Sequence, residues 1–188
     1  MPGRTPKRGR GPLAITGTPG SGKSRAAREL PPSWGAREVG ELAVDRGTGR
    51  RRRDHVQVDL ARLRRSLSRR PPTGPYLLVG HLAHLLPVDG AIVLRCHPLV
   101  LRDRLAAARR GTPAERQENL VAEAIDLVVR EARERRLPVW EIDTTDRTPR
   151  SVARAIERIV RDRRPVRGPA IDWLADPRVT AHLLDRPS

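Results

Sequence analysis

The chain has 188 residues and a mass of 21.0 kDa, enough for one domain with a substantial core and too little for two full domains. Its charge is strongly positive, because 38 Lys and Arg residues stand against 22 Asp and Glu residues and give a formal net charge of +16. The aromatic content of 2% excludes an aromatic stacking platform for single-stranded nucleic acid. The single cysteine, Cys96, excludes an internal disulfide and a cysteine-based zinc site, and we expect it to be a small core residue.

Short apolar runs alternate with segments of helical periodicity from residue 13 onward. The apolar runs predict strands at 13–16, 76–79, 91–96 and 139–142, and a further run lies at 56–59. A strand is also expected at 37–39, between two helical segments. Helical periodicity predicts helices at 23–30, 40–46, 60–68, 99–108, 114–136 and 149–163. Strands that alternate with helices of this length are typical of an α/β fold, with a parallel sheet covered by helices on both faces.

The composition also divides the chain into three parts. Residues 1–12 are rich in Gly, Pro and Arg and lack an acidic residue, so we expect a disordered basic arm. Residues 13–164 form the folded domain. Residues 165–188 form a C-terminal tail, whose apolar part we expect to dock on the domain or on a partner. The apolar run at 13–16 is too short for a signal-peptide core or a membrane span, so we expect a soluble, cytoplasmic protein.

Residues 17–24 read Gly-Thr-Pro-Gly-Ser-Gly-Lys-Ser and match the pattern G-x-x-x-x-G-K-[ST] of a phosphate-binding loop. Glycines let successive backbone N–H groups turn inward around a phosphate, Lys23 can reach the β- and γ-phosphate oxygens, and the Ser24 hydroxyl can ligate Mg²⁺. The loop follows an apolar strand and opens a helix, which is the arrangement that the motif requires. The sequence therefore predicts a site for ATP and Mg²⁺.

Further motifs follow this loop in a fixed order. They are Val39-Gly40-Glu41-Leu42, Gly80-His81-Leu82-Ala83-His84-Leu85-Leu86-Pro87, Val93-Leu94-Arg95, Arg110-Gly111 with Glu118-Asn119, and Glu141-Ile142-Asp143-Thr144-Thr145. Together they resemble the adenylate kinase isoenzyme 6 family in its archaeal form, over about residues 13–163. The resemblance implies a P-loop nucleoside monophosphate kinase with a five-stranded parallel sheet. It also implies phosphate transfer from ATP to AMP, ATPase activity and a role in small ribosomal subunit maturation through a ribosomal protein.

The resemblance also assigns site residues, and these fall into three groups. The ATP-binding loop is carried over to Gly20, Gly22, Lys23, Ser24 and Arg25, with Ser24 as the metal ligand. A mobile lid is expected at 109–118, where Arg110 closes over ATP, stabilises the transferring phosphoryl group and excludes water. The monophosphate-binding segment is expected at 38–57. His81 resembles the histidine near the γ-phosphate, and a metal pair of His81 with His84 lacks an evident third ligand.

Two positions depart from the family pattern. Val79 stands where family members usually carry the Asp that organises Mg²⁺ through water, and Asp59 or Asp143 could take over this role. The monophosphate-binding segment, acidic and aromatic in the family, here carries Arg46 and the run Arg50 to Arg53. In the tail, Asp172-Trp173-Leu174 resembles a motif of some archaeal relatives, and Trp173 is either a docking anchor or a simple packing residue.

The arginine excess leaves two hypotheses open. A compositional bias spread over solvated faces requires no function, whereas a polyanion partner would be served by the run 46–53 and by the arginines on the next helix. The first functional hypothesis is therefore an adenylate kinase that converts ATP and AMP into two ADP. The second is an ATP-driven assembly factor with little kinase activity, which binds a ribosomal protein or rRNA of the small subunit through its arginines.

Overall fold

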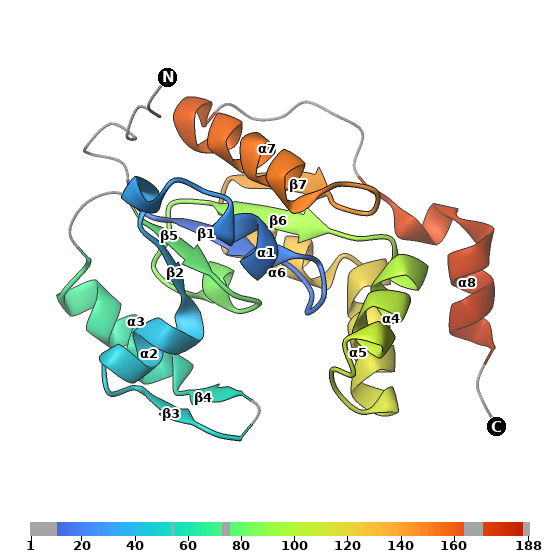
Figure 1. Ribbon diagram of the computed structural model, residues 1–188, viewed down its shortest axis with the longest axis horizontal. Coiled ribbons are helices and arrows are strands. Elements are labelled where there is room, and N and C mark those ends of the chain that lie inside the picture. The colour runs from blue at the N-terminus through green and yellow to red at the C-terminus, as the bar shows by residue number, and fades with distance from the viewer. Residues whose placement is uncertain (1–10, 54, 73–75, 164–170, 186–188) are drawn as a thin grey trace.

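The computed structural model describes residues 11–53, 55–72, 76–163 and 171–185. Its centre is one parallel sheet with the strand order β2-β5-β1-β6-β7 (Figure 1). The strands are β1 (Leu13–Thr16), β2 (Ala36–Glu38), β5 (Leu77–Val79), β6 (Ala91–Arg95) and β7 (Val139–Asp143). The α/β class and the five-stranded parallel sheet expected from the sequence are thus confirmed. Most of the basic arm expected at 1–12 lies outside the described residues.

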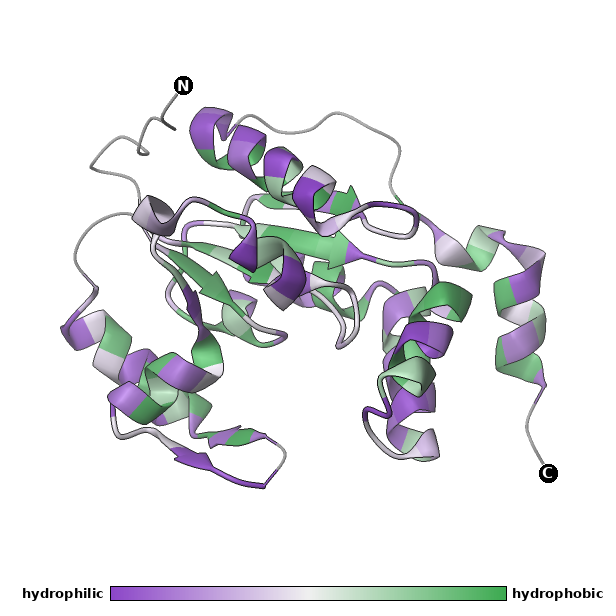
Figure 2. Ribbon diagram, viewed as in Figure 1, coloured by the Kyte–Doolittle hydropathy of each residue, from purple (hydrophilic) through white to green (hydrophobic). Residues whose placement is uncertain are grey.

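The sheet is covered on both faces because its central strands are apolar on both sides, as the hydropathy colouring shows (Figure 2). Successive side chains of a strand point to opposite faces. Accordingly, Leu13 and Ile15 join the core on one face, with the helices α1 (Lys23–Arg28) and α7 (Pro149–Asp162). Ala14 joins the core on the other, with α2 (Val39–Asp45), α3 (Leu60–Arg69) and α6 (Leu127–Glu134).

One predicted helix is wrong in its extent. The sequence predicts a continuous helix over 114–136, but the structure has α5 (Pro113–Ala124) and α6, separated at Asp126, whose φ of 59° is left-handed. The break has a tertiary cause, because Asp126 and Glu123 both pair with the buried guanidinium of Arg95. The preceding helix, α4 (Pro98–Ala107), is close to its prediction.

Several short elements complete the fold. The apolar run at 56–59 becomes β4 (Val56–Val58), which pairs with β3 (Gly49–Arg51) in an antiparallel hairpin outside the main sheet. Three 3-10 turns lie at η1 (Pro32–Trp34), η2 (Ala83–Leu85) and η3 (Trp173–Ala175). The tail ends in α8 (Pro177–Leu184), which Asp176 caps and which the sequence did not predict. Across the described residues, every helix is too short or too polar to cross a membrane.

The arrangement leaves the carboxyl ends of the central strands between two projecting parts (Figure 1). On one side lie α2, α3 and the β3-β4 hairpin, and on the other lie α4 and α5. The loop after β1 lies between them. Ligands of open parallel sheets bind at such carboxyl ends, so the fold places the sequence-predicted loop where a ligand site is expected.

Candidate active site

The loop at 17–22 has a backbone that only glycine tolerates at its key turns. Gly17 and Gly20 have φ values of 136° and 92°, in the left-handed region. A Cβ at Gly17 would lie 2.3 Å from the carbonyl oxygen of Leu94, and one at Gly20 would lie 2.8 Å from a methyl group of Leu101. The loop therefore runs directly against β6 and α4, and the sequence pattern is explained by this close approach.

Lys23 lies inside this loop, with 8% of its surface exposed. Its ammonium donates hydrogen bonds to the carbonyl oxygens of Gly17 at 2.7 Å and Thr18 at 2.9 Å, and to Ser21 Oγ at 3.4 Å. Burial lowers the pKa of Lys23 to about 8, although the negative charges of Glu123 and Glu38 oppose this shift. The side chain thus stays largely protonated at neutral pH and presents a poorly solvated positive charge, which favours binding of an anion.

Two buried contacts fix the loop to distant parts of the chain. Thr144, at the carboxyl end of β7, donates from its hydroxyl to Ser21 O at 3.0 Å and to Arg95 O at 2.8 Å. On the other side, the Thr18 hydroxyl donates to Glu123 Oε2 at 2.6 Å. Because both contacts are buried, they hold the loop in place without help from solvent.

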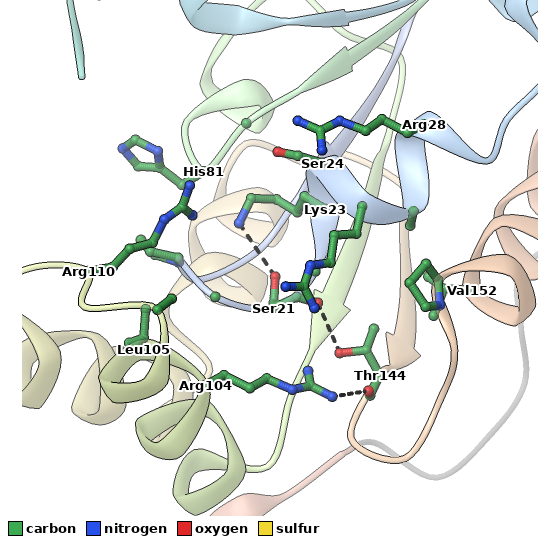
Figure 3. A pocket seen from close by; sticks show the side chains of 18 of the residues that line it. Ser21, Lys23, Ser24, Arg28, His81, Arg104, Leu105, Arg110, Thr144 and Val152 are labelled. Atoms are coloured by element: carbon green, nitrogen blue, oxygen red, sulfur yellow. Dashed lines mark hydrogen bonds between the residues drawn. The ribbon is translucent and has the colours of Figure 1, made fainter. Parts of the chain in front are cut away.

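A cavity of about 470 Å³ opens above the loop (Figure 3). Its wall includes the loop, the start of α1, the ends of β2 and β5, and parts of α4 and α7. Positive charge dominates the wall, contributed by Lys23, Arg25, Arg28, Arg104, Arg110 and Arg147. The size and charge suit a polyanionic ligand such as the phosphate chain of a nucleotide.

The sequence-predicted loop residues all line this cavity. Gly20 and Gly22 form its floor, and Ser24 and Arg25 on the first turn of α1 are both exposed. In the part of the chain that the structure describes, the Ser24 hydroxyl has no recorded hydrogen bond, so its oxygen is available as a ligand for a hard cation.

Arg110 comes from the opposite wall, and Figure 3 shows its guanidinium approaching Lys23. It follows the end of α4, just before Thr112 and Glu115 form the capping box of α5. The expected lid at 109–118 is therefore a short connection followed by the first turns of α5. The positive charge of Arg110 lowers the pKa of Lys23, so the two cations are close enough to interact with the same bound anion.

The two histidines of the Gly80 motif differ in their surroundings. His81 lines the cavity, and desolvation together with the charge of Lys23 lowers its pKa, so its ring is neutral at pH 7. His84 is fully buried, and its ring nitrogens contact Thr16 Oγ1 and Glu131 Oε2, both at 2.9 Å. These two contacts hold η2 against β1 and α6, which gives His84 a structural role. Among the described residues no cluster of three His, Cys, Asp or Glu side chains could hold a metal.

The candidates for the missing carboxylate at position 79 are placed elsewhere. Val79 is buried at the end of β5. Asp59 caps α3 by accepting from the Arg62 amide, and Asp143 accepts from the amide and hydroxyl of Thr145. Neither lines the cavity. The residue of the expected monophosphate segment that does reach it is Glu38.

Sequence reasoning missed a buried charged cluster beneath the loop. Arg95, 1% exposed, donates to Glu123 at 2.7 Å and to Glu141 at 2.8 Å, and pairs with Asp126. Trp173 of the tail donates its indole N–H to Glu123 Oε1 at 3.1 Å, and its ring lies 5.9 Å from the Arg95 guanidinium. The tail thus docks on the domain through Trp173, one of the two alternatives left open.

Two further polar groups near the loop have structural roles. Arg104 lines the cavity but donates to the carbonyl oxygens of Thr144 at 2.9 Å and Thr145 at 2.8 Å, which holds α4 against the end of β7. Cys96 is fully buried, and burial raises the pKa of its thiol to about 12. The thiol is therefore protonated and unreactive, as expected for a core residue.

Comparison with known proteins places this geometry in a family context. Residues 13–126 match the family described as "AAA domain". A protein of Archaeoglobus fulgidus is 38% identical over 170 residues, which cover 87% of this chain and 92% of that protein, and one of Pyrococcus furiosus is 35% identical over 164 residues, covering 86% and 90%. Both carry the description "Putative adenylate kinase".

A solved structure is similar in fold. The shikimate kinase from Acinetobacter baumannii in complex with shikimate superposes with a TM-score of 0.55, covering 81% of this chain and 93% of that chain at 14% sequence identity. At this identity the similarity concerns the fold alone, and it agrees with a P-loop kinase architecture around a five-stranded parallel sheet.

Proposed function

The chain belongs to this archaeal adenylate kinase family and is a nucleoside monophosphate kinase-like phosphotransferase, and we propose that it transfers the γ-phosphate of ATP to AMP. The proposal is supported by the cavity, where Lys23 of the loop and Arg110 of the opposite wall are close enough to bind the same phosphate group. Phosphoryl transfer depends on positioning and on neutralising charge, and this cavity supplies both.

In the proposed mechanism, the backbone N–H groups of 17–22 bind the β-phosphate and the Lys23 ammonium binds the β- and γ-phosphate oxygens. Arg110 has a planar fork that binds two oxygens of the transferring phosphoryl group and stabilises its charge in the transition state. When the connection at 109–118 closes, water is excluded and AMP is favoured as the acceptor. When it is open, the neutral His81 ring can orient a water molecule instead, which accounts for a slow ATPase activity.

The residues present fit the Mg²⁺ that this chemistry requires. Mg²⁺ prefers oxygen ligands, retains several of its waters and is completed by substrate phosphates, so it needs few ligands from the protein. The exposed Ser24 hydroxyl at the cavity would be its ligand from this chain. Mg²⁺ held there would supply charge neutralisation for the phosphate groups.

The test is the acceptor dependence of ADP formation by the full chain. We expect ADP to form rapidly with AMP and much more slowly without it. Lys23→Ala should abolish turnover, and Arg110→Ala should lower kcat by about a thousandfold. Arg102→Ala is the matched control, because Arg102 lies on α4, is paired with Asp103 and does not line the cavity. A rate of phosphate release that AMP does not change would contradict the kinase and support an assembly ATPase.

A second candidate function, binding of rRNA of the small ribosomal subunit, is favoured by an arginine-rich face. Residues 46–70 contain ten arginines against two aspartates, which is half of the net charge of the chain. Eight of them lie in the β3-β4 hairpin and α3, Arg46 follows α2 and Arg70 follows α3, and nine of the ten are exposed. Arg51 and Arg52 contact Glu41 and Gln57, but these contacts lie on the surface.

The second candidate is tested with a fluorescently labelled single-stranded RNA. We expect binding that weakens steeply with salt, that survives Lys23→Ala and that weakens when Arg50, Arg52 and Arg53 are replaced by Ser. Absence of binding at low salt would contradict this candidate, and a ribosomal protein would then be the remaining partner. If the protein shows kinase activity but binds no RNA, the first proposal still holds. The RNA-binding test is therefore independent of the test for kinase activity.

A further inference from the structure

The cavity wall contains an unexpected charge. Among the described residues that line the cavity, Glu38 is the only one with a carboxylate, whereas six carry positive charge. A carboxylate repels the phosphates that the six cations attract, so its presence weakens binding of a free polyphosphate. A further positive group between the carboxylate and the phosphates would turn this repulsion into attraction.

The position of Glu38 is set by the sheet. Glu38 is the last residue of β2 and pairs in register with Val79, the last residue of β5. Parallel strands bring their carboxyl ends to the same edge, so Glu38 lies beside the position whose family carboxylate is missing. Gly80 and His81 continue β5 along the cavity wall next to it.

The carboxylate of Glu38 is not used for packing. Glu38 stands at the N-cap of α2 but makes no side-chain capping bond. In the described ranges it has no recorded hydrogen bond or ion pair, in contrast to Glu123 and Asp143, whose oxygens are taken by several donors. Its negative charge raises the pKa of Lys23. Glu38 therefore faces the phosphate end of the cavity with a free acceptor.

We propose that Glu38 is the carboxylate that positions the nucleotide-bound Mg²⁺ in this protein, in place of the one that position 79 lacks. The proposal rests on the proposed function only in requiring a Mg²⁺–nucleotide complex in the cavity. Ser24 offers a hydroxyl ligand from the loop side, and Glu38 accepts hydrogen bonds from metal-bound water on the β2 side. Glu38 is thus a positioning residue, and it explains why one negative charge is kept in a positive cavity.

A different role for Glu38 would be a hydrogen bond to the acceptor, because it begins the expected monophosphate-binding segment at 38–57. The register with Val79 favours the metal, since it places Glu38 at the carboxyl ends of the strands, where the phosphate-binding loop also begins. The experiment below separates the two roles.

The test compares Glu38→Gln with wild type by calorimetric titration of the full chain with AMPPNP, a non-hydrolysable ATP analogue, with and without Mg²⁺. The ratio of the two dissociation constants measures the coupling between metal and nucleotide. We expect this coupling to fall by about tenfold to a hundredfold in the variant. Without Mg²⁺, the variant should bind AMPPNP at least as tightly as wild type, because a repulsive charge is gone.

Two precautions make the result specific. The titrations are run at about pH 6, where Lys23 with its pKa of about 8 is protonated in both proteins, so a changed Lys23 charge does not contribute. Glu157→Gln is the matched control, because Glu157 lies on α7, pairs with Arg161 and does not line the cavity. Its coupling should equal that of wild type.

The outcomes distinguish the proposals. An unchanged Mg²⁺ coupling with a raised KM for AMP would overturn the metal role and assign Glu38 to the acceptor. Equal weakening with and without Mg²⁺ would overturn it as well, because Glu38 would then act on the nucleotide or the fold. The titrations contain no acceptor and no turnover, so the metal role can hold even if AMP proves not to be the acceptor.

Discussion

Replacing Glu123 by Gln should destabilise the protein strongly, although the side chain keeps its shape. Glu123 is 2% exposed, and it neutralises Arg95, which is 1% exposed. Its Oε1 accepts from Arg95 Nε, the Cys96 amide and Trp173 Nε1, and its Oε2 accepts from the Thr18 hydroxyl. An amide has one acceptor oxygen and no charge. With that oxygen toward Arg95, the NH₂ group faces the Thr18 hydroxyl, which must turn to accept; in the other orientation the NH₂ group faces three N–H donors.

The expected magnitude follows from the remaining partners of Arg95. Removing one partner of a buried ion pair costs about 3 to 5 kcal/mol, and we expect the lower end, about 3 kcal/mol, because Asp126 and Glu141 still face the guanidinium. For a chain of this size that loss lowers Tm by about 6 to 12 °C.

Urea unfolding followed by circular dichroism measures the loss, with an unchanged m-value showing that the unfolding reaction is the same. Glu157→Gln is again the matched control, because it breaks the surface pair with Arg161 and should cost about 0.5 kcal/mol or less. If Glu123→Gln unfolded within about 1 kcal/mol of wild type, the reasoning would be refuted, since the charge would not be needed to hold Arg95.

Two further changes probe the same packing. Trp173→Phe keeps an aromatic ring but removes the donor to Glu123, and we expect a loss of about 1 kcal/mol in urea unfolding, whereas an unchanged stability would mean that the tail contact contributes nothing. Burial lowers the pKa of His84, so below about pH 6.5 the unfolded chain binds the proton that the folded chain excludes. The free energy of unfolding should therefore fall as the pH is lowered from about 7 to about 5. His84→Gln should make the free energy of unfolding less dependent on pH in this range.

The fold could be predicted to the extent that it is encoded locally. The three central strands, β1, β5 and β6, are short apolar runs, and their burial on both faces follows from this composition. The edge strands β2 and β7 contain charged residues and are only partly buried. The break at Asp126 could not be predicted, because Ile125 and Leu127 continue the helical pattern across it. The break depends on Arg95, which is 31 residues away in the sequence.

The candidate site divides in the same way. The loop, with Lys23 and Ser24, is a continuous motif whose backbone demands glycine, so it is visible in the sequence. Thr144 and Glu123 hold the same loop but lie more than 100 residues from it, and no spacing rule connects them. The sequence signal for Glu38 is weaker than that for the loop. It consists only of an acidic residue between a strand and a helix, a position that lies at the ligand-binding edge of such a sheet.

Glu123 links three parts of the protein that the sequence presents as separate. Its Oε2 contacts the phosphate-binding loop and its Oε1 contacts the tail, and its helix, α5, directly follows the connection that carries Arg110. Trp173 is one of the donors that fix the position of the Glu123 carboxylate, so a tail that moved away would leave this carboxylate, and with it the Thr18 contact, less firmly positioned. The tail is therefore part of the scaffold that shapes the nucleotide loop, and changes in Trp173 should be felt in ATP binding as well as in stability.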